Sequence, residues 1–116
     1  MRALRYDRFG PPDELRLVDI PLPQPRAGEV RVRVDAASLN PLDAKIRAGH
    51  LRMLPVLARP PRGTGCDLAG EIVAIGGGPT ERHVGERVFG SLPPFGREGA
   101  CAEYVIVGAH RVIPIP

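Results

Sequence analysis

Residues 30–36, VRVRVDA, alternate between apolar and charged side chains up to Asp35. Val30, Val32 and Val34 fall on one side of an extended chain, and the charged residues between them fall on the other. This period of two predicts a β-strand with one face in a hydrophobic core. It is the clearest secondary-structure signal in the chain, so a β-sheet is the starting point for the fold.

Other short apolar segments lie on both sides of this strand, and turn residues separate them. The additional predicted strands cover residues 1–6, 15–23, 66–76, 87–90, 100–107 and 110–115. One segment instead predicts about two turns of helix. Asn40 or Ser38 can cap this helix, and Pro41 suits its first position. Gly49 can end it.

Glycine and proline number 14 each among the 116 residues, about twice the combined share in average proteins. Such a composition favours short strands joined by turns over long helices. An irregular loop is expected over residues 51–63, and the strand over 66–76 is expected to bend at Gly70. No βαβ alternation appears. The pattern therefore predicts a mainly β fold, a small and partly open β-barrel with one or two short helices.

The charge pattern excludes some classes of partner. The net charge of +3 comes from scattered arginines, with Lys45 the only lysine. They form no stripe with interleaved aromatic residues, so we expect no nucleic-acid binding. No apolar run is long enough to span a membrane, and residues 1–10 are too polar for a signal peptide. With only two cysteines and no CxxC pair, the expected location is the reducing cytoplasm.

Two segments have a more specific pattern than the strands. The first is ASLNPLDAKIRAG at residues 37–49; the second is GTGCDLAGEIVAIG at 63–76, followed by GERV at 85–88. In this order and spacing they resemble the N-terminal, GroES-like domain of the medium-chain dehydrogenase/reductase superfamily. The resemblance is greatest to the zinc-independent quinone oxidoreductase (zeta-crystallin-like) branch and extends over essentially the whole chain. It implies the substrate-side domain of an NAD(P)H-dependent oxidoreductase that acts on a quinone, an enone or another carbonyl, or is alcohol dehydrogenase-like.

The resemblance also implies that metal is absent. Zinc-dependent relatives have a cysteine ligand at the position of Asn40, and a Gly-His-Glu run at the positions of Gly65, Cys66 and Asp67. Their four-cysteine structural zinc lobe is replaced here by a short segment that contains only Cys101. An amide is a poor zinc ligand, and zinc requires several N or S ligands at fixed geometry. We therefore expect a zinc-free site.

Asn40 matches the residue that faces the nicotinamide and the substrate in the quinone-reductase branch. An amide can donate and accept hydrogen bonds without ionising, so we expect a catalytic and cofactor-facing role for Asn40. The family often has tyrosine where this chain has Lys45, which can meet a ribose, a phosphate or an oxyanion, or lie exposed on the helix. We place Asn40, Lys45, Cys66 and Asp67 in the substrate cleft, with Lys45 also near the cofactor. Asp43 is expected to support the short helix.

The family's chemistry requires a Rossmann domain that binds NADPH or NADH. The chain ends at IPIP, close to the end of the resembled domain, and no GxGxxG fingerprint precedes that end. We expect residues 1–116 to form the GroES-like domain without its Rossmann partner, to bind no cofactor and to be inactive alone. An apolar face left exposed in this way is compatible with a homodimer.

Three alternatives remain open. The run Gly76-Gly77-Gly78-Pro79 can suggest phosphate binding, but it lacks the GxGxxG pattern and is expected to be a turn. The GroES-like barrel is also the fold of a ring-forming chaperonin cofactor. The third alternative is a non-catalytic, stand-alone binding domain derived from a reductase.

Overall fold

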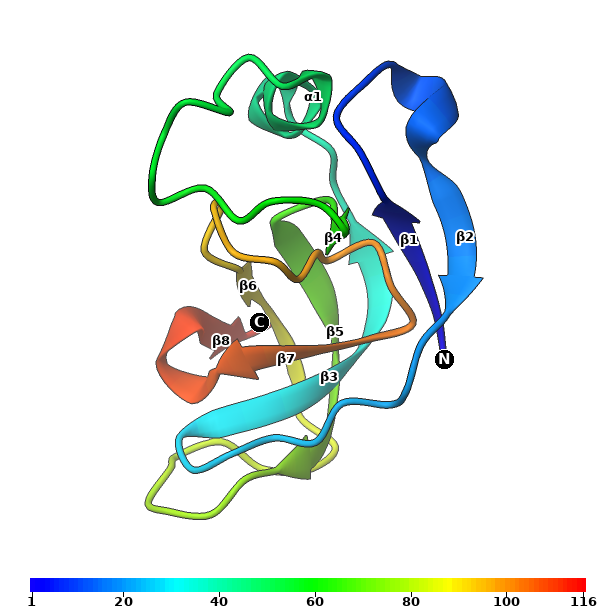
Figure 1. Ribbon diagram of the computed structural model, residues 1–116. Helices are drawn as coiled ribbons and strands as arrows, with labels where there is room; N and C mark the ends of the chain where they lie inside the picture. The colour runs from blue at the N-terminus through cyan, green and yellow to red at the C-terminus, as the bar shows by residue number, and fades with distance from the viewer.

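The computed structural model describes all 116 residues and contains eight strands, one α-helix and two short 3-10 helices (Figure 1). The strands are β1 (Arg2–Tyr6), β2 (Arg16–Asp19), β3 (Glu29–Ala37), β4 (Arg62–Gly63), β5 (Asp67–Ile75), β6 (Arg87–Ser91), β7 (Tyr104–Gly108) and β8 (Val112–Pro114). The helices are α1 (Pro41–Ala48), η1 (Pro12–Glu14) and η2 (Ala109–Arg111). The mainly β architecture with one short α-helix confirms the predicted fold class.

Five strands form the larger sheet, in the order β7-β3-β5-β6-β8, with every neighbouring pair antiparallel. The valine alternation of β3 faces the core as predicted, because Val30 and Val32 are completely buried. Val32 pairs with Ile72 of β5, which is also completely buried. These residues belong to one cluster of ten buried apolar residues. Burial of this shared face is what holds the larger sheet together.

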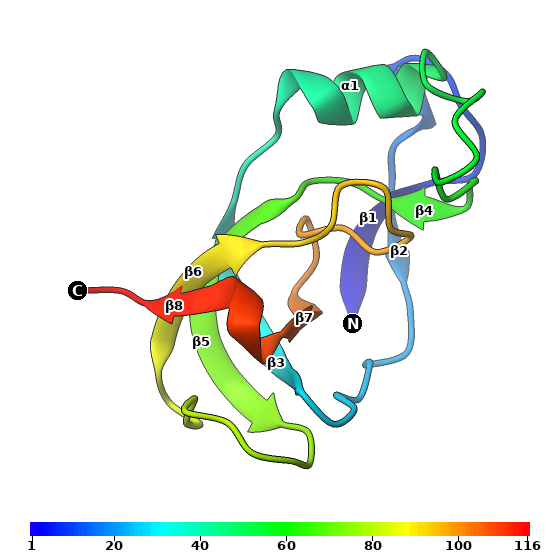
Figure 2. The same cartoon turned by 90° about the vertical axis from the view of Figure 1, so that its left-hand side faces the viewer.

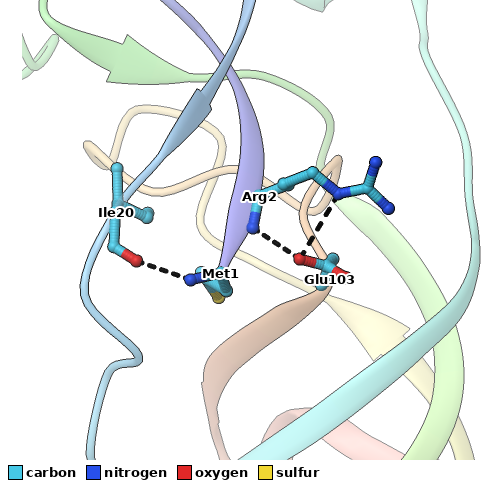
Figure 3. A network of polar contacts seen from close by, with 4 residues as sticks. All are labelled: Met1, Arg2, Ile20 and Glu103. Carbon is cyan, nitrogen blue, oxygen red and sulfur yellow. Dashed lines mark hydrogen bonds and ion pairs between the residues drawn. The ribbon is translucent and has the colours of Figure 1, made fainter.

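The smaller sheet has the order β2-β1-β4 and includes the N-terminus. Figure 3 shows how the start of β1 is fixed. The Met1 ammonium donates a hydrogen bond to the Ile20 carbonyl at 2.8 Å, and the backbone N–H of Arg2 donates to the carboxylate of Glu103. The Leu4 N–H also donates to the Cys101 carbonyl at 2.9 Å. The bonds to Glu103 and Cys101 join the smaller sheet to the chain just before β7.

Two predicted strands are longer than the observed ones. The prediction over residues 15–23 becomes β2 of only four residues, since prolines follow it and cannot donate to a ladder. The prediction over 100–107 becomes β7, which begins at Tyr104. Residues 100–103 instead bond to Thr64, Gly65 and β1. Gly70 lies within β5, where an added Cβ would be only 2.0 Å from the Arg33 carbonyl oxygen.

The helix α1 is where the sequence predicted it. Asn40 is its N-cap, Pro41 opens it, and Gly49 ends it with a left-handed φ of 88° that glycine adopts without strain. Figure 2 shows α1 lying across one end of the larger sheet, with the loop over residues 49–61 beside it. α1 has eight residues, and no helix in the structure is long and apolar enough to cross a membrane.

Candidate active site at the junction of β3, α1 and β5

The two sequence motifs meet where β3 ends and β5 begins. Ala37, the last residue of β3, pairs with Leu68 of β5, and the Ser38 N–H donates to the Asp67 carbonyl at 3.2 Å. The chain then turns through Ser38 and Leu39 into the N-cap of α1. Residues almost thirty positions apart in the sequence are thereby brought together. We call the five polar side chains here, Ser38, Asn40, Asp43, Cys66 and Asp67, the junction cluster.

Asp67 organises the exposed half of this cluster. Its Oδ2 atom accepts a hydrogen bond from Asn40 Nδ2 at 2.9 Å and another from Ser38 Oγ at 3.0 Å. All three residues are exposed. A carboxamide NH2 group has two donor hydrogens, so one can bond to Asp67 while the other is directed elsewhere. The carboxylate therefore holds the Asn40 amide in one orientation at the molecular surface.

Asp43 organises the buried half and is only 8% exposed. Its Oδ2 atom accepts a hydrogen bond from the Asn40 backbone N–H at 2.7 Å, and its own N–H donates to the Asn40 carbonyl at 2.9 Å. The bond from the Asn40 N–H to the Asp43 carboxylate satisfies the N–H of the cap residue. It also places a negative charge at the positive end of the helix. Asp43 thus fixes the backbone of Asn40, while Asp67 fixes its side chain.

The Cys66 thiol completes the buried half. Its Sγ atom lies 3.6 Å from Asp43 Oδ1 and donates a weak hydrogen bond to it. Burial, reinforced by the nearby Asp43 carboxylate, raises the pKa of Cys66 from 9.0 to about 11. The thiolate is the nucleophilic and metal-binding form of cysteine. Cys66 is therefore a neutral hydrogen-bond donor near pH 7, and this argues against a role for it as a nucleophile.

The donor set of the junction cluster does not suit zinc. Asn40 presents an amide, and Asp67 presents a carboxylate that already accepts two hydrogen bonds. Nowhere in the 116 residues do three or more His, Cys, Asp or Glu side chains converge in a way that could hold a metal ion. These groups can orient a substrate by hydrogen bonding, and no metal-dependent step is derived from them.

Lys45 of α1 follows Asn40 by five residues. Its side chain is exposed in the last turn of the helix and makes no hydrogen bond or ion pair. Five residues along an α-helix correspond to about 7.5 Å of rise and more than a full turn. Hydrogen bonds link Asn40, Cys66 and Asp67 through the junction cluster, and the Lys45 side chain is not part of this hydrogen-bonded group. The sequence predicted Ser38 only as a possible helix cap and not as a member of this site. Its position two residues before Asn40, at the same strand end, is the signal that could have indicated it.

Two shallow hollows open beside Asp67 on the same face. One is lined by Ala36, Ala37, Ser38, Asp67, Leu68 and Ala69. The other has a volume of about 390 Å³ and includes Asp67, Phe89 and Ile113 among its lining residues. Leu39 and Ile113 are 57% and 54% exposed. The Asn40 amide, bonded to Asp67, therefore lies near an open surface with apolar and polar lining residues rather than in an enclosed pocket.

The two antiparallel sheets with one short α-helix are those of a GroES-like domain. The chain belongs to the alcohol dehydrogenase GroES-like domain family, whose model matches residues 26–116. This confirms the family resemblance inferred from the motifs at residues 37–49 and 63–76.

Individual relatives narrow the comparison. The chain is 37% identical over 117 residues to the quinone oxidoreductase of Homo sapiens, a match that covers all of this chain and 34% of that protein. Its structure is similar to the quinone oxidoreductase from Coxiella burnetii (TM-score 0.83, 35% identity), covering 98% of this chain and 36% of that one.

It is also similar to an Escherichia coli quinone oxidoreductase solved with NADPH (TM-score 0.87, 25% identity), covering 100% and 33% of the two chains. The chain therefore spans about a third of the length of the relatives it matches.

Proposed function

We propose that residues 1–116 form the substrate-side half of a zinc-free, NAD(P)H-dependent reductase site for a quinone, an enone or a related carbonyl compound. The observation on which this proposal rests is the Asn40 carboxamide, oriented by Asp67 at 2.9 Å on an exposed face. The similarity to quinone oxidoreductases over the whole chain supports the substrate class.

The cluster can orient a carbonyl compound without ionising. One hydrogen of the Asn40 NH2 group bonds to Asp67, and the other can donate to a substrate oxygen or to the carboxamide of a nicotinamide ring. Such a donor stabilises the negative charge that develops on that oxygen during reduction. When bound, NADPH would supply the hydride; this chain would contribute orientation and apolar surface.

Cofactor phosphates have no evident cradle in the chain. The glycine run at residues 76–78 follows β5 and lies in the irregular connection to β6, where Gly78 adopts a φ of 94°. No helix begins there, so the arrangement of a dinucleotide fingerprint is absent. We therefore propose that the cofactor is held by a second domain that packs against the face containing Asn40.

A comparison of two proteins tests this proposal. The first is the 116-residue chain alone; the second joins it to the remaining two thirds of human quinone oxidoreductase in place of that enzyme's own first domain. We expect NADPH oxidation dependent on 1,4-benzoquinone from the joined protein and none from the chain alone. Turnover by the chain alone would contradict the proposal that residues 1–116 supply only the substrate side of the active site. A ring of seven chains in solution, measured by light scattering, would instead favour a chaperonin-cofactor role.

A further inference from the structure

A separate, largely apolar cavity lies between β1 and β7. Its volume is about 120 Å³, and nine of its fourteen lining residues are hydrophobic. Ala3 and Leu4 of β1 form one wall, and Val105 and Ile106 of β7 form another. No member of the junction cluster lines it, so it is a site distinct from the proposed reductase half-site.

Hydrogen bonds fix the walls of this cavity. The Met1 ammonium holds the Ile20 carbonyl at 2.8 Å, and Glu103 holds the backbone of Arg2, as Figure 3 shows. Met1 and Ile20 both line the cavity. The Leu4 N–H and Cys101 carbonyl join β1 to the opposite wall at 2.9 Å. The backbone of the cavity walls is thereby tied at several points.

Two charged side chains, those of Arg5 and Glu98, border this largely apolar space. The Arg5 side chain is 16% exposed and makes no hydrogen bond; its nearest ionic partner is Glu98, with Nη1 and Oε2 3.9 Å apart. Both residues line the cavity. A guanidinium has five N–H donors and no acceptor. Because the Arg5 side chain makes no hydrogen bond within the chain, its N–H groups are available to an oxygen acceptor on a ligand.

We propose that this cavity binds a single-ring aromatic molecule with one oxygen acceptor, the class represented by phenol. An engineered apolar cavity of about 150 Å³ in another protein binds benzene, so the volume is of the right order for one ring. The ring would contact Leu4, Val105 and Ile106, and its oxygen would accept from Arg5. A fused two-ring molecule exceeds the space, and the apolar lining disfavours a charged ligand.

Methyl NMR spectra of the 116-residue chain test the proposal, with phenol, benzene and 2-naphthol as probes. We expect saturable shifts for the methyl groups of Leu4, Val105 and Ile106 with phenol, weaker binding of benzene and no binding of 2-naphthol. Absence of saturable shifts with phenol, or shifts confined to residues outside the cavity, would overturn the proposal.

Matched variants locate the binding. Ile20→Phe fills the cavity and should weaken phenol binding by at least about tenfold, whereas Val84→Phe adds the same ring to an exposed turn and should leave binding unchanged. Ile106→Phe fills the cavity from the opposite wall and serves if Ile20→Phe does not fold. Arg5→Met should remove the preference for phenol over benzene. Unchanged phenol affinity in a folded filling variant, or an unchanged preference in Arg5→Met, would overturn the assignment.

Discussion

The buried sheet and the junction cluster are neighbours held together by different forces. In the sheet, Val32 and Ile72 are completely buried and pack against apolar partners only. In the junction cluster, two carboxylates accept four hydrogen bonds from Ser38, Asn40 and Cys66. The sheet supplies most of the stability, and the cluster orients one amide at the surface. Stability and function should therefore respond separately to substitution.

Truncation in the sheet should have the largest effect on stability. Ile72→Ala removes buried methyl groups from the center of the ten-residue core and leaves a cavity. We expect the free energy of unfolding to fall by about 2–5 kcal/mol. Urea denaturation measures this, with Ile113→Ala as the exposed control, expected to change stability by less than about 0.5 kcal/mol. Equal effects of the two substitutions would contradict the position of the core.

Substitution of Asp43, the buried carboxylate of the junction cluster, should have the second largest effect on stability. Asp43→Asn keeps the shape of the side chain but removes the charge that accepts from the Asn40 N–H and the Cys66 thiol. We expect a loss of about 1–3 kcal/mol, the cost of disturbing a buried polar group and a helix cap. Urea denaturation gives the loss. Alkylation of Cys66 should become faster, because the Asp43 charge helps to raise its pKa; an unchanged rate would contradict that contact.

The pH dependence of stability reports on the buried titratable groups, of which Cys66 has the largest shift in pKa. Burial raises the pKa of Cys66 to about 11 in the folded chain, whereas the unfolded thiol titrates near 9.0. Between these values the unfolded state loses its proton first, so the free energy of unfolding falls as pH rises from about 9 to 11. Burial also raises the pKa of Tyr6 and of Cys101, in the same direction. Thermal unfolding across this pH range should show the loss of stability, and Cys66→Ala should make that loss smaller. An equal loss of stability in Cys66→Ala would exclude Cys66 as one of its causes.

The exposed carboxylate should have the smallest effect on stability. Asp67→Asn alters an exposed group with hydrogen bonds to Ser38 and Asn40, so we expect a change within about 0.5 kcal/mol. The side-chain NH2 resonances of Asn40 should shift nonetheless, because their acceptor has changed. Unchanged Asn40 resonances would show that Asp67 does not orient the amide.

The local parts of this structure could be predicted from the sequence. The alternation of Val30, Val32 and Val34 predicted β3, and the Asn40-Pro41 pair with Gly49 predicted both ends of α1. Neither the start of β7 at Tyr104 nor the pairing that brings Ser38 to Asp67 has a local signal. Both depend on hydrogen bonds between distant segments, which periodicity does not report.

The central claim, that Asn40 is the group through which this domain acts on substrate, has a direct test in the joined protein. The kcat/KM for 1,4-benzoquinone with NADPH is measured for the unsubstituted protein, for Asn40→Ala and for Lys45→Met. We predict a loss of about a hundredfold for Asn40→Ala, the cost of one hydrogen-bond donor to a developing oxyanion, and little change for Lys45→Met. An unchanged kcat/KM in Asn40→Ala would contradict the account.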